Sequence, residues 1–177
     1  MKQLIEEASK RGLVFYNSSQ EHDILLLKWW VHLNNTGDFD RLFGDSQRPL
    51  AKFLRIFTPP CVLILAIEND NTWAAIWFTP AGERADAAFV GYWCDESKRG
   101  SRKHMALSVF TYDMAFKFWK VLVGVTKQEC LLAIHRKAGY NIVGQVPYFM
   151  EGEDAWVLYL TEDNWHNSKY YQTGKKI

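Results

Sequence analysis

The chain has 177 residues, of which 48% are hydrophobic and 15% aromatic, and its net charge of +1 excludes a general attraction to nucleic acid or anionic lipid. No stretch approaches the about 18 apolar residues of a membrane span, and the N-terminus carries acidic residues where a signal peptide is apolar. Its three cysteines, Cys61, Cys94 and Cys130, form no CxxC pair, so we expect a cytoplasmic protein without a zinc site or a disulfide framework.

The N-terminal part, residues 1–58, is predicted to be mainly helical. Its apolar spacing predicts three helices and one short strand, at residues 2–11, 18–35, 48–57 and 12–16 respectively. Ser18 with Glu21 matches a capping box at the start of the second helix, and an Asn-Asn-Thr-Gly sequence ends that helix.

From residue 61 the apolar pattern changes to that of strands. Three strands joined by short turns predict an antiparallel meander, at residues 61–69, 72–80 and 85–93. A helix, a strand, a helix and a final hairpin follow, at residues 101–119, 120–126, 127–140, 141–150 and 154–161. A strand–helix–strand unit places its two strands parallel through a right-handed crossover. The sequence therefore predicts one α/β domain over residues 1–161, a mixed sheet flanked by helices with a sheet-containing part at 61–161. Residues 162–177 are polar and are expected to form a loosely packed extension.

A basic turn, Lys-Arg-Gly-Ser-Arg-Lys-His at residues 98–104, lies between a predicted strand and a predicted helix. One interpretation is a solvated turn with a favourable helix start. Another is a site for a phosphate-bearing ligand, because a helix N-terminus offers unpaired amides and a positive dipole. Nucleic acid is the least favoured partner, since no aromatic residue interrupts the run and no recognition-helix motif follows it.

This turn, the element order from Cys61 to Thr161 and the segment 123–140 together resemble the GNAT superfamily of acyl-CoA-dependent N-acyltransferases. The resemblance implies a GNAT-like fold with an extra helical N-terminal portion, acetyl-CoA or another acyl-CoA as cofactor, and an amine substrate. In that family the turn reads Arg/Gln-x-x-Gly-x-Gly/Ala, and its amides hold the pyrophosphate of coenzyme A.

The resemblance carries the cofactor-binding role to eight residues, Trp93, Arg99, Gly100, Ser101, Arg102, Lys103, His104 and Gln128. Arg99 matches the first residue of the family turn, but Arg102 stands at the key glycine and His104 at the Gly/Ala position. Side chains at these two places would crowd a pyrophosphate laid on the backbone, whereas cations add charge-assisted contacts. Whether coenzyme A is bound, or no cofactor at all, is therefore left open.

His135 falls at the position of the family tyrosine that protonates the departing thiolate. A histidine suits general acid catalysis near neutral pH, and it equally suits the C-terminal turn of a helix, where a cation meets the negative end of the dipole. The strand before the turn contains no acid. Asp86 precedes it, and Asp95 and Glu96 follow it, but their spacing assigns no general base.

Two functions remain. The first is an N-acyltransferase, in which an amine attacks the thioester while backbone amides near Tyr92–Cys94 polarise the carbonyl. The alternative is a non-catalytic head-assembly protein of a tailed phage in the host cytoplasm, with particle proteins as partners. A weaker resemblance supports it, through the tryptophan-rich strand 73–78 and the basic turn. The replaced glycine positions favour the alternative, and the element order fits both.

Overall fold

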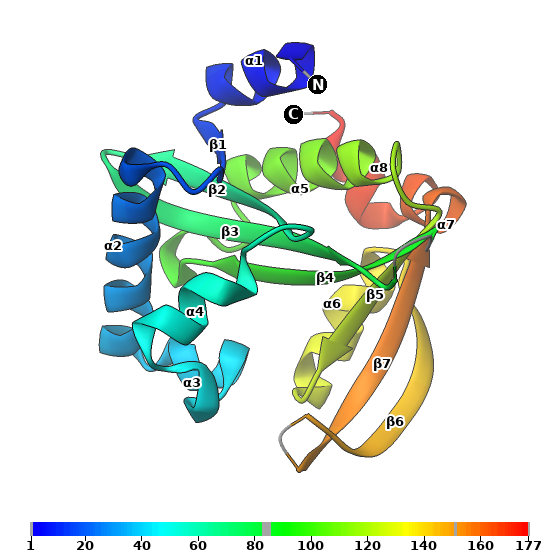
Figure 1. Ribbon diagram of the computed structural model, residues 1–177. Coiled ribbons are helices and arrows are strands. Elements are labelled where there is room, and N and C mark those ends of the chain that lie inside the picture. The colour runs from blue at the N-terminus through cyan, green and yellow to red at the C-terminus, as the bar shows by residue number, and fades with distance from the viewer. Residues whose placement is uncertain (1, 83–85, 151, 177) are drawn as a thin grey trace. The chain divides into compact units, whose positions relative to one another are not determined.

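The computed structural model describes residues 2–82, 86–150 and 152–176, and its elements are labelled in Figure 1. The described strands form one sheet in the order β1-β2-β3-β4-β5-β7-β6. Their bounds are β1 (Leu13–Phe15), β2 (Val62–Glu68), β3 (Asn71–Pro80), β4 (Ala87–Cys94), β5 (Val121–Thr126), β6 (Asn141–Met150) and β7 (Glu153–Thr161). β4 runs parallel to β5, and β7 runs antiparallel to both β5 and β6. This mixed sheet with flanking helices confirms the predicted α/β class, the parallel unit and the final hairpin.

The chain forms two compact units, Met1–Trp77 with Tyr92–Asp95 and Phe78–Gly91 with Glu96–Ile177. β3 and β4 contribute residues to both units. In the described part of the chain, no helix combines the length and the apolar composition that crossing a membrane requires.

The first unit is built around aromatic side chains. Its helices are α1 (Lys2–Lys10), α2 (Gln20–Thr36), α3 (Asp38–Phe43) and α4 (Leu50–Ile56), with a 3-10 turn at Asp45–Gln47. α2, α3 and α4 lie close together in Figure 1. Trp29 of α2 is buried at their centre, and its ring centroid lies 5.6 Å from that of Phe53 and 5.7 Å from that of Trp93. The helices thus share one core with the end of β4.

The start of α2 differs from the prediction by one residue. Ser19 is the capping residue, with an extended backbone and a hydroxyl that accepts from the His22 amide at 3.4 Å. Ser18 has a positive φ of 54° and precedes the cap. Because two adjacent serines can both cap a helix, the Ser-x-x-Glu pattern selected the wrong one. The helix ends at Gly37 as predicted, in the left-handed conformation with φ 73°.

The second unit holds the remaining helices. They are the 3-10 turn η2 (Glu96–Lys98), α5 (Arg102–Ala115), the 3-10 turn η3 (Glu129–Leu131), α6 (Leu132–Lys137), α7 (Glu162–His166) and α8 (Lys169–Gly174). The helix predicted over 127–140 is therefore shorter, since its first turn is 3-10 and Gly139, with φ 92°, follows its end.

The polar C-terminal segment is folded, so the expected loose packing is wrong. Trp165 of α7 and Tyr171 of α8 are buried, at 1% and 4% exposure. The Trp165 indole donates to Asp113 of α5 at 2.9 Å. At Gly174 an added Cβ would come within 2.8 Å of Val109 on α5, so α8 approaches that helix closely. Two large aromatic anchors hold a segment whose other residues are mostly polar.

Candidate functional site

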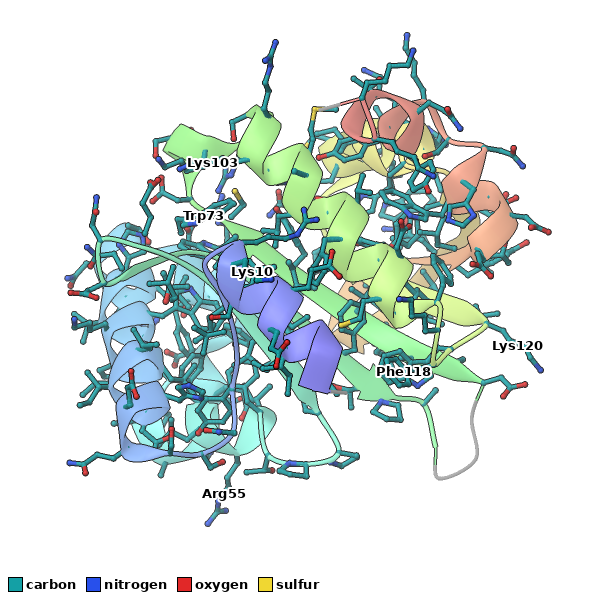
Figure 2. The ribbon with its side chains drawn as sticks, turned by 90° about the horizontal axis from the view of Figure 1, so that it is seen from above. Lys10, Arg55, Trp73, Lys103, Phe118 and Lys120 are labelled. Atoms are coloured by element: carbon teal, nitrogen blue, oxygen red, sulfur yellow. The ribbon has the colours of Figure 1, made fainter. Side chains whose placement is uncertain are left out.

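The basic turn has the predicted strand–turn–helix layout, and Lys103 marks the start of α5 in Figure 2. Gly100 adopts φ 72°, in the left-handed region that favours glycine. Ser101 caps α5, since its hydroxyl accepts from the His104 amide at 3.2 Å. A glycine and a serine in sequence therefore set the direction in which the helix leaves the turn.

The turn uses its own amides as donors. The Gly100 amide donates to Nδ1 of His104 at 2.9 Å. Three neighbouring amides donate to backbone oxygens, Arg99 to Glu96 at 3.2 Å, Ser101 to Lys98 at 3.1 Å and Met105 to Ser101 at 3.0 Å. A pyrophosphate held on the Gly100 amide would first have to displace the His104 ring.

His104 fills the turn in its neutral form. Burial lowers the pKa of its imidazole, and the positive charge of Arg99 lowers it further. Because Nδ1 accepts from Gly100, the proton of the neutral ring lies on Nε2. Protonation of Nδ1 would remove that acceptor and release the Gly100 amide.

The cations of the turn point outward. The side chains of Arg99, Arg102 and Lys103 are all exposed. Guanidinium and ammonium groups bind phosphate oxygens by charge-assisted hydrogen bonds, with Arg offering a bidentate geometry. The turn can therefore hold an anion with side chains even while the Gly100 amide is occupied.

The Trp93 side chain belongs to the core of the first unit. It is 3% exposed, and its indole donates to Oδ2 of Asp38 at 2.9 Å. Asp38 is itself buried and pairs with Arg41. This leaves the backbone of Trp93, rather than its ring, for the cofactor contact that the sequence predicts.

His135 lies on α6 with its Nδ1 at 2.8 Å from the Leu131 carbonyl oxygen. Burial lowers the pKa of this imidazole, and the bond to Leu131 opposes the shift in part. The neutral ring is therefore favoured, with its proton on Nδ1. Gln128 precedes η3, and its backbone amide donates to the Thr126 hydroxyl at 3.1 Å.

Two tyrosines beside His135, the buried Tyr140 and the partly buried Tyr112, were not anticipated. The His135 ring meets Tyr140 edge-on at 5.3 Å, and the Tyr140 hydroxyl lies 3.1 Å from that of Tyr112 on α5. Burial raises the pKa of Tyr112 to about 12 and that of Tyr140 well above its ordinary value. Both hydroxyls keep their protons at neutral pH. Nothing in the local sequence pattern paired Tyr112 with Tyr140.

A histidine and an aspartate at the end of β4 form a second unanticipated pair. His32 of α2 places Nε2 at 3.5 Å from Oδ2 of Asp95, which directly follows β4. The His32 ring also meets the Trp93 ring edge-on at 5.4 Å. Asp95 was visible in the sequence as an acid after the strand, but no spacing connected it with His32.

A surface pocket of about 440 Å³ lies in the second unit, and it is lined by Tyr140, the ring neighbour of His135, but by none of the predicted site residues themselves. Its lining is basic and amide-rich: Arg136, Lys137, Gly139, Tyr140, Asn141, Asn164, Asn167, Ser168 and Lys169. Gly139 makes this packing possible, because a Cβ there would lie 2.3 Å from the Asn164 carbonyl oxygen. Within residues 2–82, 86–150 and 152–176, no three His, Cys, Asp or Glu side chains are grouped to hold a metal ion.

No protein-family model and no curated protein sequence matches the chain. Solved structures do match. RimJ of Mycobacterium smegmatis, in complex with CoA-disulfide, aligns with a TM-score of 0.66 at 10% identity, over 93% of this chain and 88% of that one. AAC(6')-Ib, in complex with ribostamycin and coenzyme A, aligns with a TM-score of 0.63 at 18% identity, over 89% of this chain and 96% of that one.

A ribosomal-protein-S5-alanine acetyltransferase from Vibrio fischeri gives a TM-score of 0.61 at 12% identity, over 86% of this chain and 98% of that one. The chain has the GNAT fold. The match extends beyond residues 61–161, on which the sequence resemblance depended, and at these identities it establishes the fold of this GNAT-like chain alone.

Proposed function

We propose that this GNAT-like chain is an N-acyltransferase that transfers an acyl group from acyl-CoA to an amine. The observation that carries the proposal is the basic turn, which opens α5 in a chain with the GNAT fold and exposes Arg99, Arg102 and Lys103. The similar structures of RimJ and AAC(6')-Ib contain CoA-disulfide and coenzyme A, which supports acetyl-CoA as the first cofactor to test.

The turn would hold the pyrophosphate mainly through side chains. Arg102 and His104 replace the small residues of the family turn, and His104 already occupies the Gly100 amide. Charge-assisted hydrogen bonds from Arg99, Arg102 and Lys103 would then replace some of the backbone-amide bonds that hold the pyrophosphate in the family turn. Ser101 caps the helix, and Gln128 lies at the start of the later helical segment.

In the proposed reaction, an amine nitrogen attacks the thioester carbonyl carbon. The C–N bond forms, the C–S bond breaks, and the thiolate of coenzyme A takes up a proton. The protein contributes positioning and the backbone amides of Tyr92–Cys94, which would polarise the carbonyl. His135 is the proposed proton donor to the thiolate. Its lowered pKa means that this role would be lost at a lower pH than for an ordinary imidazole.

We propose a cationic amine as acceptor, in the cytoplasm. The structure of AAC(6')-Ib contains ribostamycin, and the Vibrio fischeri protein is described as a ribosomal-protein-S5-alanine acetyltransferase. Both descriptions concern amine-bearing molecules, which supports the same substrate class here.

The second candidate function is a non-catalytic protein that keeps the fold, and the Gly100–His104 bond favours it because that bond occupies the turn. Its narrower form, a phage head-assembly protein, gains no support from the structures named above, all of which are acetyltransferase-fold proteins bound to coenzyme A or described as acetyltransferases.

Calorimetric titration with acetyl-CoA separates the two candidates. An N-acyltransferase should bind acetyl-CoA at micromolar strength and should gain thermal stability from it by mass action. Release of coenzyme A in the presence of ribostamycin or of a peptide with an N-terminal alanine would complete the assignment. Absence of binding at millimolar acetyl-CoA would leave the non-catalytic candidate.

A further inference from the structure

We propose that His32 is the general base of the acyl transfer, and that Asp95 and Trp93 hold its ring in position. The inference rests on the proposed function and assigns the proton acceptor for which the sequence offers no residue. All three side chains belong to the first unit, two of them at the end of β4 and one on the facing side of α2.

His32 reaches the end of β4 because of its place on α2. The residues of α2 that face the core are Leu26, Trp29 and Leu33. His32 lies one position before Leu33, at the border of this buried stripe, so its ring can contact the core while part of it meets solvent. Its side chain is 40% exposed, which leaves an edge open to a ligand.

The groups that hold the ring are themselves fixed. The Trp93 indole donates to the Asp38 carboxylate at 2.9 Å, and its ring packs on Trp29 at 5.7 Å between ring centroids. The Asp95 amide donates to the Trp73 carbonyl oxygen at 2.8 Å, which anchors the backbone that carries the carboxylate. The imidazole therefore contacts a rigid indole on one side and an anchored carboxylate on another, and little ordering remains for the reaction itself.

The orientation leaves one nitrogen for chemistry. With the Nε2 proton directed at Asp95, the neutral ring carries its lone pair on Nδ1, which has no hydrogen-bond partner among the described residues. A protonated amine would give one proton to Nδ1, and the free amine would then attack the thioester carbon. As the C–S bond breaks, His135 gives a proton to the thiolate, the second amine proton passes to water, and His135 regains a proton from water. His32 afterwards returns its proton to water.

The charges around His32 favour this role. The Asp95 carboxylate lies 3.5 Å from Nε2 of His32 and is opposite in charge to the imidazolium that forms. Asp38, which accepts from the Trp93 indole, is also paired with Arg41. Lys28, one helical turn before His32, directs its ammonium to the Asp70 carbonyl oxygen at 3.4 Å.

The position of His32 also matches the proposed reaction centre. Its ring contacts Trp93, and the backbone amides of Tyr92–Cys94 are the groups proposed to polarise the carbonyl. A base beside these amides is close to the carbon that the amine must reach.

The chain supplies a matched control for this proposal. His166 pairs with Asp113 at 3.4 Å, and the exposures of the two side chains, 39% and 34%, resemble the 40% and 29% of His32 and Asp95. Asp113 already accepts from the Trp165 indole at 2.9 Å and from the Tyr171 hydroxyl at 3.5 Å, so this pair joins α5 to the C-terminal helices. The His166–Asp113 pair therefore has the same two side chains as the His32–Asp95 pair, but its role is to hold helices together.

The test measures coenzyme A release by chromatography, with acetyl-CoA and either ribostamycin or a peptide with an N-terminal alanine, from low to high pH. His32→Gln should lower kcat/KM by about 100-fold at neutral pH, the usual scale of general base catalysis, while acetyl-CoA affinity stays unchanged. The rate of this variant should recover at high pH, where the amine is itself unprotonated. Asp95→Asn should lower the rate less and should shift the same limb of the pH profile.

His166→Gln and Asp113→Asn should keep the wild-type profile, and thermal melting should show that each variant is folded. Wild-type turnover with an unchanged profile in both His32→Gln and Asp95→Asn would overturn the inference and leave the proposed function intact. If His32→Gln does not fold, Asp95→Asn decides alone. Lack of wild-type turnover with both amines would overturn the proposed function, and the inference with it.

Discussion

The basic turn of the second unit and the Trp93 region of the first unit use polar groups in opposite ways. In the turn, the Gly100 amide is bound by the protein's own His104, and the cations face outward. Around Trp93, polar groups fix a buried ring, and His32 is left half-exposed with an unused nitrogen. The motif therefore marks the proposed cofactor site, while the contacts decide which of its groups are still available to a ligand.

The largest effect is expected from removing the aromatic support of the first unit. Trp93→Ala should lower the free energy of unfolding by about 3–5 kcal/mol, because it leaves a cavity against Trp29 and removes the indole that donates to the buried Asp38 carboxylate. Trp93→Phe keeps a ring and should cost only about 1–3 kcal/mol, the scale for a buried acceptor that loses its donor. Urea denaturation measures both. Equal losses would mean that the hydrogen bond, rather than the packing, dominates.

The next effect concerns the outward cations. Arg102→Ala should weaken acetyl-CoA binding about tenfold or more, because a charge-assisted hydrogen bond contributes roughly 1.5–3 kcal/mol. The loss should shrink as salt is added, since salt screens exposed charges. Calorimetric titration at two salt concentrations measures it. Lys137→Ala, an exposed cation on the last turn of α6, is the control and should bind like wild type. An unchanged affinity in Arg102→Ala would remove the turn as the pyrophosphate site.

A smaller effect, of opposite sign, is expected at His104. His104→Ala frees the Gly100 amide and removes the ring from the turn, so acetyl-CoA should bind a fewfold more tightly, on the scale of one hydrogen bond of about 0.5–1.5 kcal/mol. Wild-type binding should also strengthen as the pH falls and Nδ1 becomes protonated, and the variant should lack this pH dependence. Weaker binding by the variant would show that the His104 ring is part of the site.

Much of the fold could be predicted because strands and long helices carry their own periodicity. The strand predicted at 120–126 and the one observed at Val121–Thr126 coincide, since a buried strand is a short apolar run between turns. α7 and α8 could not be found this way. They are only five and six residues long, and each has one buried aromatic residue, Trp165 or Tyr171, in a largely polar sequence.

In the candidate site, too, features made of contiguous residues could be predicted, and contacts between distant segments could not. The turn was found because its residues are contiguous, and the crowding by Arg102 and His104 followed from their size. The bond from Gly100 to His104 depends on a left-handed backbone that places the ring over the amide. His32 with Asp95, and Tyr112 with Tyr140, are contacts between distant segments. Such pairs leave no trace in local spacing, so a single sequence could not have joined them.

The smallest effect expected is a loss of stability in mild acid. Burial lowers the folded-state pKa of both His104 and His135, so the unfolded chain binds protons first as the pH falls. Stability should therefore be full above the unfolded value of about 6.5 and should decline as the pH falls from there towards the lowered folded pKa. Urea denaturation across this range measures the slope. His135→Gln should flatten the slope. A slope unaffected by His135→Gln would mean that the α6 histidine is not desolvated and is free to be protonated, which would strengthen its proposed role as the proton donor.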